Sequence, residues 1–207
     1  GCPHILAEPQ RTNLVTYSSD FSQSYWTKSN ATIVSNATIS PDGTLNADKL
    51  VESSTVNSHI LDTGNIGGIS GTYTYSCFAK KGENNFVVLW WVYASTSKTW
   101  FDLENGVVGS QTGTATDNAK IEDYGNGWYK CSVTRSETST ANYLVIATAE
   151  QDNVYTYQGD GTSGNYIYGA SLEAGSYATS YIPTNGGTVT RNQDIFTRDG
   201  IGSLIGQ

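Results

Sequence analysis

The chain has 207 residues, of which 37% are hydrophobic and only 14% are charged, so it can bury a globular core without disulfide or metal staples. A formal net charge of −8 excludes nucleic-acid binding through a basic surface. No apolar run approaches the roughly 20 residues of a membrane-spanning helix, which excludes membrane insertion.

Short segments of alternating polar and apolar residues recur along the chain, and no helical periodicity lasts beyond a turn or two. Turn signals such as Pro41-Asp42-Gly43 and Gly125-Asn126-Gly127 separate these segments. The pattern predicts an all-β chain folded as a two-sheet antiparallel jelly-roll β-sandwich. The predicted strands, in chain order, are 13–17, 31–39, 47–51, 72–80, 85–94, 99–103, 120–124, 128–134, 142–150 and 166–173.

Composition changes after Pro183, where aromatic residues become few. We therefore expect one domain over residues 1–190 and a connector towards a further domain over 191–207.

The three cysteines match no metal-binding spacing. Cys77 and Cys131 lie inside apolar strand patterns, which favours buried, unreactive thiols. A disulfide between these two is the alternative, and the sequence does not decide between them.

A series of motifs in a fixed order resembles the carbohydrate-binding-module-like jelly rolls of phage tail and bacterial surface proteins, which are concanavalin A-like or galactose-binding-like β-sandwiches. The motifs cover most of the chain, from residue 8 to about residue 191. The principal ones are Glu8-Pro9-Gln10-Arg11-Thr12-Asn13-Leu14, Pro41-Asp42-Gly43-Thr44, Thr72-Tyr73-Thr74-Tyr75-Ser76, Phe101-Asp102-Leu103, Gly125-Asn126-Gly127-Trp128-Tyr129-Lys130-Cys131, Gly159-Asp160-Gly161-Thr162-Ser163-Gly164 and Thr179-Ser180-Tyr181-Ile182-Pro183-Thr184.

This resemblance implies a non-catalytic module of a larger phage or surface protein that binds a cell-surface glycan, outside the cell or on a virion surface. The acidic net charge favours a neutral polysaccharide over a polyanionic one, unless a local basic patch intervenes. Other copies of the module or neighbouring domains of the parent protein are further expected partners.

The segment 85–94 is apolar on both faces, so its outer face is either covered or forms a binding cleft. The packing of the similar modules would turn Val87, Leu89 and Trp91 inward. Aromatic rings on the outer face would stack on sugars, while carboxylates accept hydrogen bonds from their hydroxyls. The predicted carbohydrate-binding residues are Phe86, Trp90, Trp100, Asp102, Glu104 and Tyr143.

The alternative for Trp90 is a place in the core or beneath a loop, and Trp128 is expected to pack structurally. Modules of this kind often carry a structural calcium ion away from the glycan site. The resemblance implies Asp20, Asp48 and Glu173 as its ligands, because such folds bring these motifs together.

Two other functions compete with glycan binding. A structural virion decoration or spacer domain would keep the fold without the sugar site. A glycan-cleaving enzyme needs two carboxylates across the scissile bond, and Asp102 and Glu104 share one strand face. However, Trp100 stands where similar glucanases carry glutamate, and no nucleophile or histidine motif is present, so we expect no catalysis.

Overall fold

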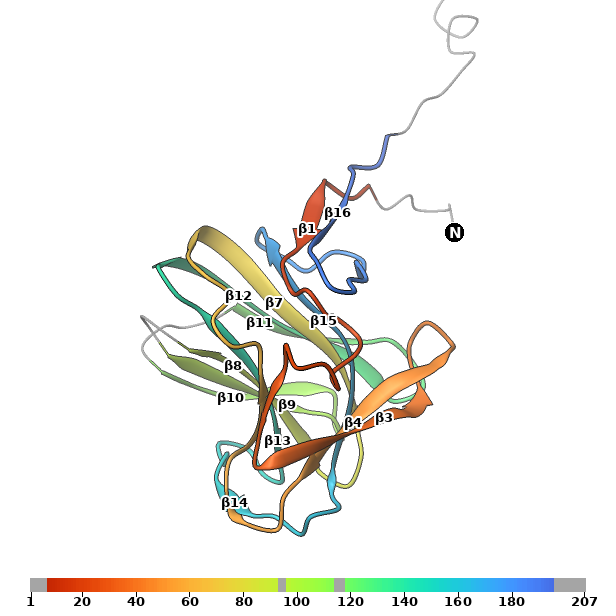
Figure 1. Cartoon of the computed structure of the whole chain (residues 1–207), viewed down its shortest axis with the longest axis vertical. Coiled ribbons are helices and arrows are strands. Elements are labelled where there is room, and N and C mark those ends of the chain that lie inside the picture. Colours follow the sequence, from red (N-terminus) through yellow and green to blue (C-terminus); the bar gives the residue numbers. More distant parts are fainter. Residues whose placement is uncertain (1–6, 93–95, 114–117, 196–207) are drawn as a thin grey trace, which may run out of the picture.

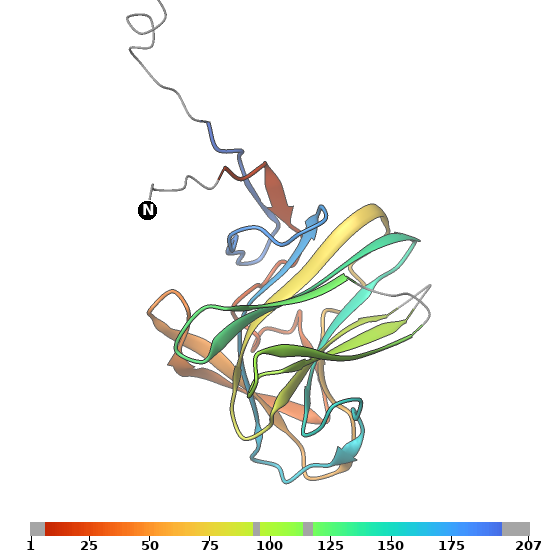
Figure 2. The ribbon, with the colours of Figure 1, turned by 180° about the vertical axis from the view of Figure 1, so that it is seen from behind.

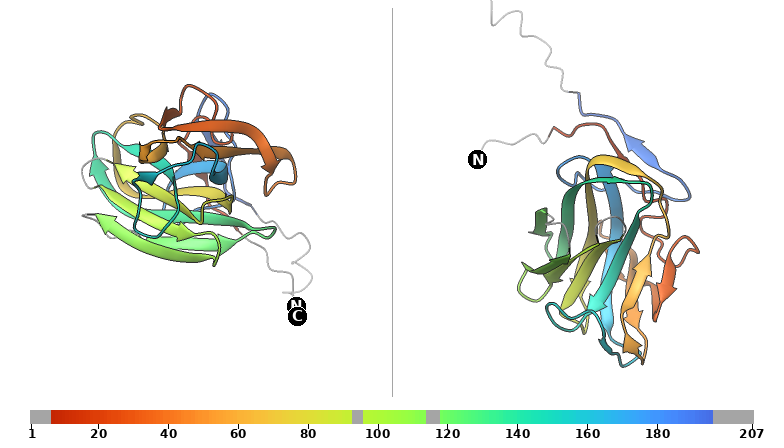
Figure 3. Two further views of the ribbon diagram at one scale, coloured as in Figure 1. Left: turned by 90° about the horizontal axis from the view of Figure 1, so that it is seen from below. Right: turned by 90° about the vertical axis from the view of Figure 1, so that its left-hand side faces the viewer.

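The computed structural model describes residues 7–92, 96–113 and 118–195, which form sixteen β-strands and no helix. Within these ranges there is consequently no apolar helix of membrane-spanning length. Two six-stranded antiparallel sheets stack as the two layers of a sandwich, confirming the predicted fold class (Figures 1 and 3). Two short two-stranded ribbons complete the fold.

The first sheet contains, in spatial order, β10 (Val107–Gly113), β9 (Ser97–Asp102), β8 (Phe86–Val92), β13 (Tyr143–Ala149), β6 (His59–Asp62) and β2 (Thr27–Ser29). The second contains β11 (Asn118–Asp123), β12 (Trp128–Ser139), β7 (Ile69–Lys81), β15 (Gly164–Ala174), β4 (Leu45–Glu52) and β3 (Ala31–Ile39). The ribbons pair β1 (Arg11–Asn13) with β16 (Val189–Arg191) and β5 (Val56–Asn57) with β14 (Tyr157–Gln158).

The main hydrophobic core lies between the two sheets and follows the alternation of strand side chains. Val87, Leu89 and Trp91 of β8 face inward, as predicted. They pack in one cluster with side chains from the facing sheet, such as Tyr75 and Leu172. Each large apolar side chain buried here contributes about 1.5–3 kcal/mol relative to an exposed one.

The predicted strand over 13–17 is wrong, because pairing ends at Asn13. The buried side chain of Asn13 donates to the backbone carbonyls of Ala170 and Ile182 and accepts from the N–H of Val15 and Leu172. Because Asn13 is bonded to residues of β15, the chain after Asn13 crosses over β15 and does not pair with another strand. Short or polar strands such as β6 and β10 were not predicted at all, since their alternation is weak.

Arg191, the predicted start of the connector, pairs with Arg11 as part of β16. Its guanidinium also forms an ion pair of 2.6 Å with Glu8. The chain is therefore tied to the sandwich at the first residue of the predicted connector. Most of that connector, 196–207, lies outside the described residues.

A bulge in β15 decides which of its side chains face outward. The register with β7 shifts between Tyr168 and Ser171. Gly169 has a φ of 62°, and a Cβ atom there would lie 2.9 Å from the ring of Phe78. Only glycine meets both constraints. Beyond the bulge, Glu173 lies on the outer face of the second sheet.

Cys77 of β7 and Cys131 of β12 stand opposite one another, and both are buried free thiols. Of the two alternatives that the sequence left open, the structure has the unpaired thiols. Burial raises the pKa of Cys77 to about 12 and that of Cys131 well above its usual range.

Because thiolates and not thiols react with Ellman's reagent, we expect neither Cys77 nor Cys131 to be modified in the native protein. A Cys2→Ser background removes the remaining thiol. The reagent should find no reactive thiol before denaturation and two thiols in guanidinium chloride. Rapid labelling of the native protein, or a disulfide in its mass spectrum, would contradict the buried pair.

Candidate functional site

The predicted aromatic face exists, but a loop covers its centre. Phe86, Trp90 and Trp100 point away from the main core, as expected. Trp100 is nevertheless 0% exposed, because it packs in a second small core with Val88 and Tyr157. Its indole N–H donates to the carbonyl of Val154 at 2.9 Å. The prediction that Trp100 offers an open binding ring is therefore wrong.

The covering loop, residues 150–157, is fastened at both sides. Asp152 accepts hydrogen bonds from the N–H and hydroxyl of Ser110 at 2.8 and 2.7 Å. The ring of Tyr155 lies 5.8 Å from that of Trp90. The ammonium of Lys98 is 4.2 Å from the Trp90 ring centre and 4.3 Å from that of Tyr155. The half-buried Trp90 therefore already holds an internal cation–π partner.

The polar members of the predicted site are engaged in local structure. Asp102 accepts from the N–H groups of Glu104 and Asn105 and so caps a turn. Although burial opposes it, these hydrogen bonds and that of the Asn105 side chain lower the pKa of Asp102. Glu104 pairs with Lys81.

Tyr143 and Phe86 stand at opposite ends of the paired strands β13 and β8, six residues apart or roughly 20 Å along the sheet. With Trp100 covered between the two strand ends, the six predicted residues do not form one continuous open site.

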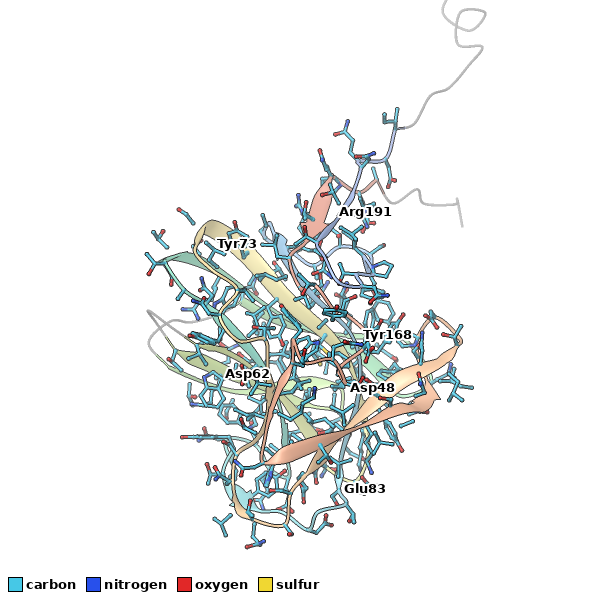
Figure 4. All side chains as sticks on the ribbon, viewed as in Figure 1. Asp48, Asp62, Tyr73, Glu83, Tyr168 and Arg191 are labelled. Atoms are coloured by element: carbon cyan, nitrogen blue, oxygen red, sulfur yellow. The ribbon has the colours of Figure 1, made fainter. Side chains whose placement is uncertain are left out.

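The three predicted calcium ligands are not one set. Asp20 and Asp48 line the same small hollow, and Asp48 is labelled in Figure 4. Glu173 lies six residues along β15 from the partner of Asp48, which is roughly 20 Å along the strand. The β15 bulge also turns Glu173 to the outer face. Among the described ranges, no three His, Cys, Asp or Glu side chains form a metal-ligand group. The structural calcium ion itself stays a prediction.

An open groove lies on the outer face of the second sheet, between β11 and the segment 175–180. We call it the β11 groove. It has a volume of about 410 Å³. It is lined by Glu8, Asn118, Ala119, Lys120, Glu122, Tyr124, Ser132, Thr134, Ser176, Tyr177, Ala178, Thr179 and Ser180.

The segment 175–180 forms one wall because the chain turns sharply after β15. Gly175 has a φ of 143°, and a Cβ atom there would lie 2.6 Å from the guanidinium of Arg11. The returning chain is then bonded to the sheet. Thr74 donates to the carbonyl of Gly175 at 2.9 Å, and the N–H of Ser180 donates to Glu8 at 2.7 Å.

Two half-exposed tyrosines mark the ends of the β11 groove. Tyr177 follows Ser176, whose carbonyl accepts a hydrogen bond from the hydroxyl of Thr134. Thr134 belongs to β12 and pairs with Asn118, the first residue of β11, so Tyr177 lies near the start of β11. Tyr124 directly follows Asp123, the last residue of β11. The two ends of β11 are roughly 17 Å apart, by the rise of five strand residues. Tyr124 is 49% and Tyr177 50% exposed. The guanidinium of Arg11 lies 5.5 Å from the centre of the Tyr177 ring, so the part of this ring that Arg11 does not cover is what a ligand can stack on.

The charges along the groove are already neutralised. Glu8 pairs with Arg191 at 2.6 Å, and Lys120 pairs with Glu122 at 2.7 Å. Burial, together with the carboxylates of Glu122 and Glu8, raises the pKa of Tyr124, so its phenol stays protonated and able to donate.

Beneath the wall lies a buried ammonium, that of Lys130, whose residue is 3% exposed. It donates to the carbonyl of Thr179 and lies 5.4 Å from the Phe78 ring centre. Burial lowers the pKa of Lys130, and the carboxylates of Glu173, Glu122 and Glu8 oppose that shift. Glu173, itself buried, accepts from the hydroxyl of Thr179. Glu173 was predicted to bind a calcium ion, but the cation near it in the structure is the ammonium of Lys130.

Sequence reasoning missed Tyr124 and Tyr177. The available signal was their surroundings, since both stand in polar, glycine-containing stretches just outside strands. An aromatic residue in such a stretch has no regular core position and is a candidate for the surface.

Neither a family model nor a curated protein matches the chain. Solved structures that are similar to it include the following three. The enzymatically active domain of bacteriophage CBA120 tailspike protein 4 is 12% identical, with a TM-score of 0.46 over 77% of this chain and 21% of that one. The Clostridium thermocellum xylanase 10B CBM22-1–GH10 modules, complexed with xylohexaose, are 15% identical, with a TM-score of 0.44 over 81% and 30%. The CBM35 of Paenibacillus barcinonensis is 14% identical, with a TM-score of 0.38 over 77% and 98%.

Because Trp100 is wholly enclosed, we expect Trp100→Ala to lower the free energy of unfolding by about 3–5 kcal/mol. Trp90→Ala should cost about 1 kcal/mol, since it removes a half-buried ring and one cation–π contact. Urea unfolding followed by circular dichroism measures both. Equal, small effects would mean that the loop 150–157 does not cover Trp100.

Lys130→Met removes the donor to the carbonyl of Thr179 and the cation nearest in effect to the buried carboxylate of Glu173, so it should destabilise the fold by about 1–3 kcal/mol. The double variant Lys130→Met, Glu173→Gln should recover much of that loss, because no unpaired charge remains. A double-mutant cycle from denaturant unfolding tests this coupling. Additive losses would contradict it.

Proposed function

We propose that the chain is a non-catalytic carbohydrate-binding module whose binding site is the β11 groove. The observation that carries this proposal is the pair of half-exposed tyrosines, Tyr124 and Tyr177, at the two ends of a polar groove. The sequence resemblance to modules of phage tail and surface proteins supports the same function. We also propose that the module acts outside the cell or on a virion surface, as part of a larger protein.

The chemistry of the groove suits a sugar chain. Pyranose rings present apolar C–H faces that stack on tyrosine rings, and their hydroxyls need donors and acceptors along the edges. Between the two tyrosines the groove offers the amide of Asn118 and the hydroxyls of Ser132 and Thr134. Its length of roughly 17 Å exceeds a single sugar ring, so it suits several units in a row.

The charged side chains between Tyr124 and Tyr177 are paired with one another, which favours neutral sugar units in the β11 groove. The carboxylates of Glu8 and Glu122 each have a cationic partner within 2.7 Å. An acidic sugar would compete with these carboxylates, whereas a hydroxyl can accept or donate without disturbing either pair. The same pairing argues against hydrolysis, which needs one carboxyl free to donate a proton and another free to attack or to activate water.

Replacing either tyrosine with alanine should weaken glycan binding roughly tenfold, because each removes one stacking platform. A glycan array followed by titration calorimetry on the best ligand measures the loss. Tyr155→Ala serves as the matched control, since Tyr155 is also a partly exposed tyrosine but packs on the opposite sheet.

Two results would count against this site. Unchanged binding in the Tyr124→Ala, Tyr177→Ala double variant would move the ligand elsewhere on the molecule. An absence of binding to every glycan by the wild-type domain would leave the module without the proposed function. Release of reducing sugars from a bound polysaccharide would contradict its non-catalytic part.

A further inference from the structure

The β11 groove does not end at Tyr124. On the other side of this ring lies a second hollow of about 330 Å³, which we call the Trp128 hollow. Its walls are the β3–β4 turn at Pro41 and the β11–β12 turn at Asn126, and Trp128 contributes to its lining. Figure 2 shows these two turns side by side, and the indole N–H of Trp128 joins them by donating to the carbonyl of Ile39 at 3.0 Å.

Tyr124 lines both hollows, so a chain lying on its ring reaches both. The ring is supported from below by Phe78, in an edge-to-face contact of 4.9 Å. Asn118 at one end of this path is exposed, and so are Gly43 and Asn126 at the other. A polysaccharide can therefore enter at one end and leave at the other without terminating in the site.

The Trp128 hollow differs from the β11 groove in charge. Lys80 is the charged side chain among the described residues that line it. The stem of Lys80 runs along the β11–β12 turn, where a Cβ atom on Gly127 would lie 3.5 Å from its Cε atom. Asp42 and Asp123 adjoin lining residues of the hollow; each accepts hydrogen bonds within its own turn, and neither lies within 4.0 Å of the Lys80 ammonium.

Lys80 also differs from three other lysines of this sheet. Lys49, Lys81 and Lys120 each form an ion pair with a glutamate. In the part of the chain that the structure describes, no carboxylate lies within 4.0 Å of the Lys80 ammonium. A half-buried cation in a hollow, held beside aromatic rings and without an acidic partner, is suited to an anionic group of a ligand.

From these observations we infer that the ligand is a linear polysaccharide with acidic units: neutral sugars occupy the β11 groove, and a sugar carboxylate in the Trp128 hollow pairs with Lys80. This inference rests on the proposed glycan-binding function and adds the class of its ligand. The lysine acts locally, because the chain as a whole carries a net charge of −8.

Matched neutral and acidic glycans test the inference. Linear glucans, mannans and galactans are immobilised beside their partly oxidised forms, in which some primary hydroxymethyl groups have become carboxylates on the same backbone. For the glycan that binds, we expect the oxidised form to bind the wild-type domain roughly tenfold more tightly than its parent. This preference should fall in about 1 M salt, where the Debye length is roughly 3 Å.

Lys80→Gln should abolish the preference for the oxidised form while leaving binding of the neutral parent. Lys81→Gln is the matched control, since it removes the same charge from the next residue, which pairs with Glu104 on the opposite face of the strand. Lys80→Arg keeps the charge and should keep the preference, which separates recognition of the anion from any loss of folding in Lys80→Gln.

A preference for the neutral glycan, or one for the oxidised glycan that survives Lys80→Gln, would overturn the inference and leave the proposed function standing. Binding to neither form of any glycan would overturn the proposed function itself, and the inference with it.

Discussion

The candidate site depends on how the buried charge of Lys130 is compensated. An ammonium removed from water needs a strong partner, and the structure supplies the carbonyl of Thr179, the ring face of Phe78 and the nearby carboxylate of Glu173. Glu173 in turn accepts from the hydroxyl of Thr179. Both charges therefore hold the same short segment, 175–180, against the sheet. Because that segment cannot leave without stranding two buried charges, the wall of the β11 groove is preorganised. A ligand that binds there loses little free energy to ordering the protein.

The outer apolar side chains of the two sheets are covered in different ways. A two-layer sandwich has no third layer to cover apolar side chains on its outer faces. On the first sheet, the loop 150–157 provides a cover, with Val154 bonded to the Trp100 indole and Tyr155 beside Trp90. On the second sheet, Phe78, Trp128 and Tyr168 form their own cluster, and the turns around it leave hollows at its edge. The open surface is consequently found where the outer apolar cluster is covered incompletely.

Sequence alternation predicted the side chains' directions well and their accessibility poorly. It separated Val87, Leu89 and Trp91 from Trp90, because direction follows from the period of two along a strand. The packing of the similar modules then gave the inward set, and the structure has that set in the core. Whether an outward ring is open depends on contacts such as that of Trp100 with Val154, which is 54 residues away. No local pattern contains that information. The misplacement of Glu173 among the calcium ligands has a similar cause, since one extra residue at the Gly169 bulge turned it to the other face.

The net charge of the chain is likewise a poor guide to the charge of the ligand, because it sums side chains that lie too far apart to interact with one bound group. The acidic composition favours a neutral ligand only if every carboxylate of the chain repels an anion at the site. At physiological ionic strength, however, exposed charges are screened beyond roughly 8 Å. The groove carboxylates Glu8 and Glu122 each have an ion-pair partner, whereas no described carboxylate lies within 4.0 Å of the Lys80 ammonium. A ligand that lies along this face therefore meets paired charges first and then a lysine that has no ion-pair partner among the described residues. Its preference is set by those few contacts, and the remaining acidic surface mainly affects how fast a charged chain approaches.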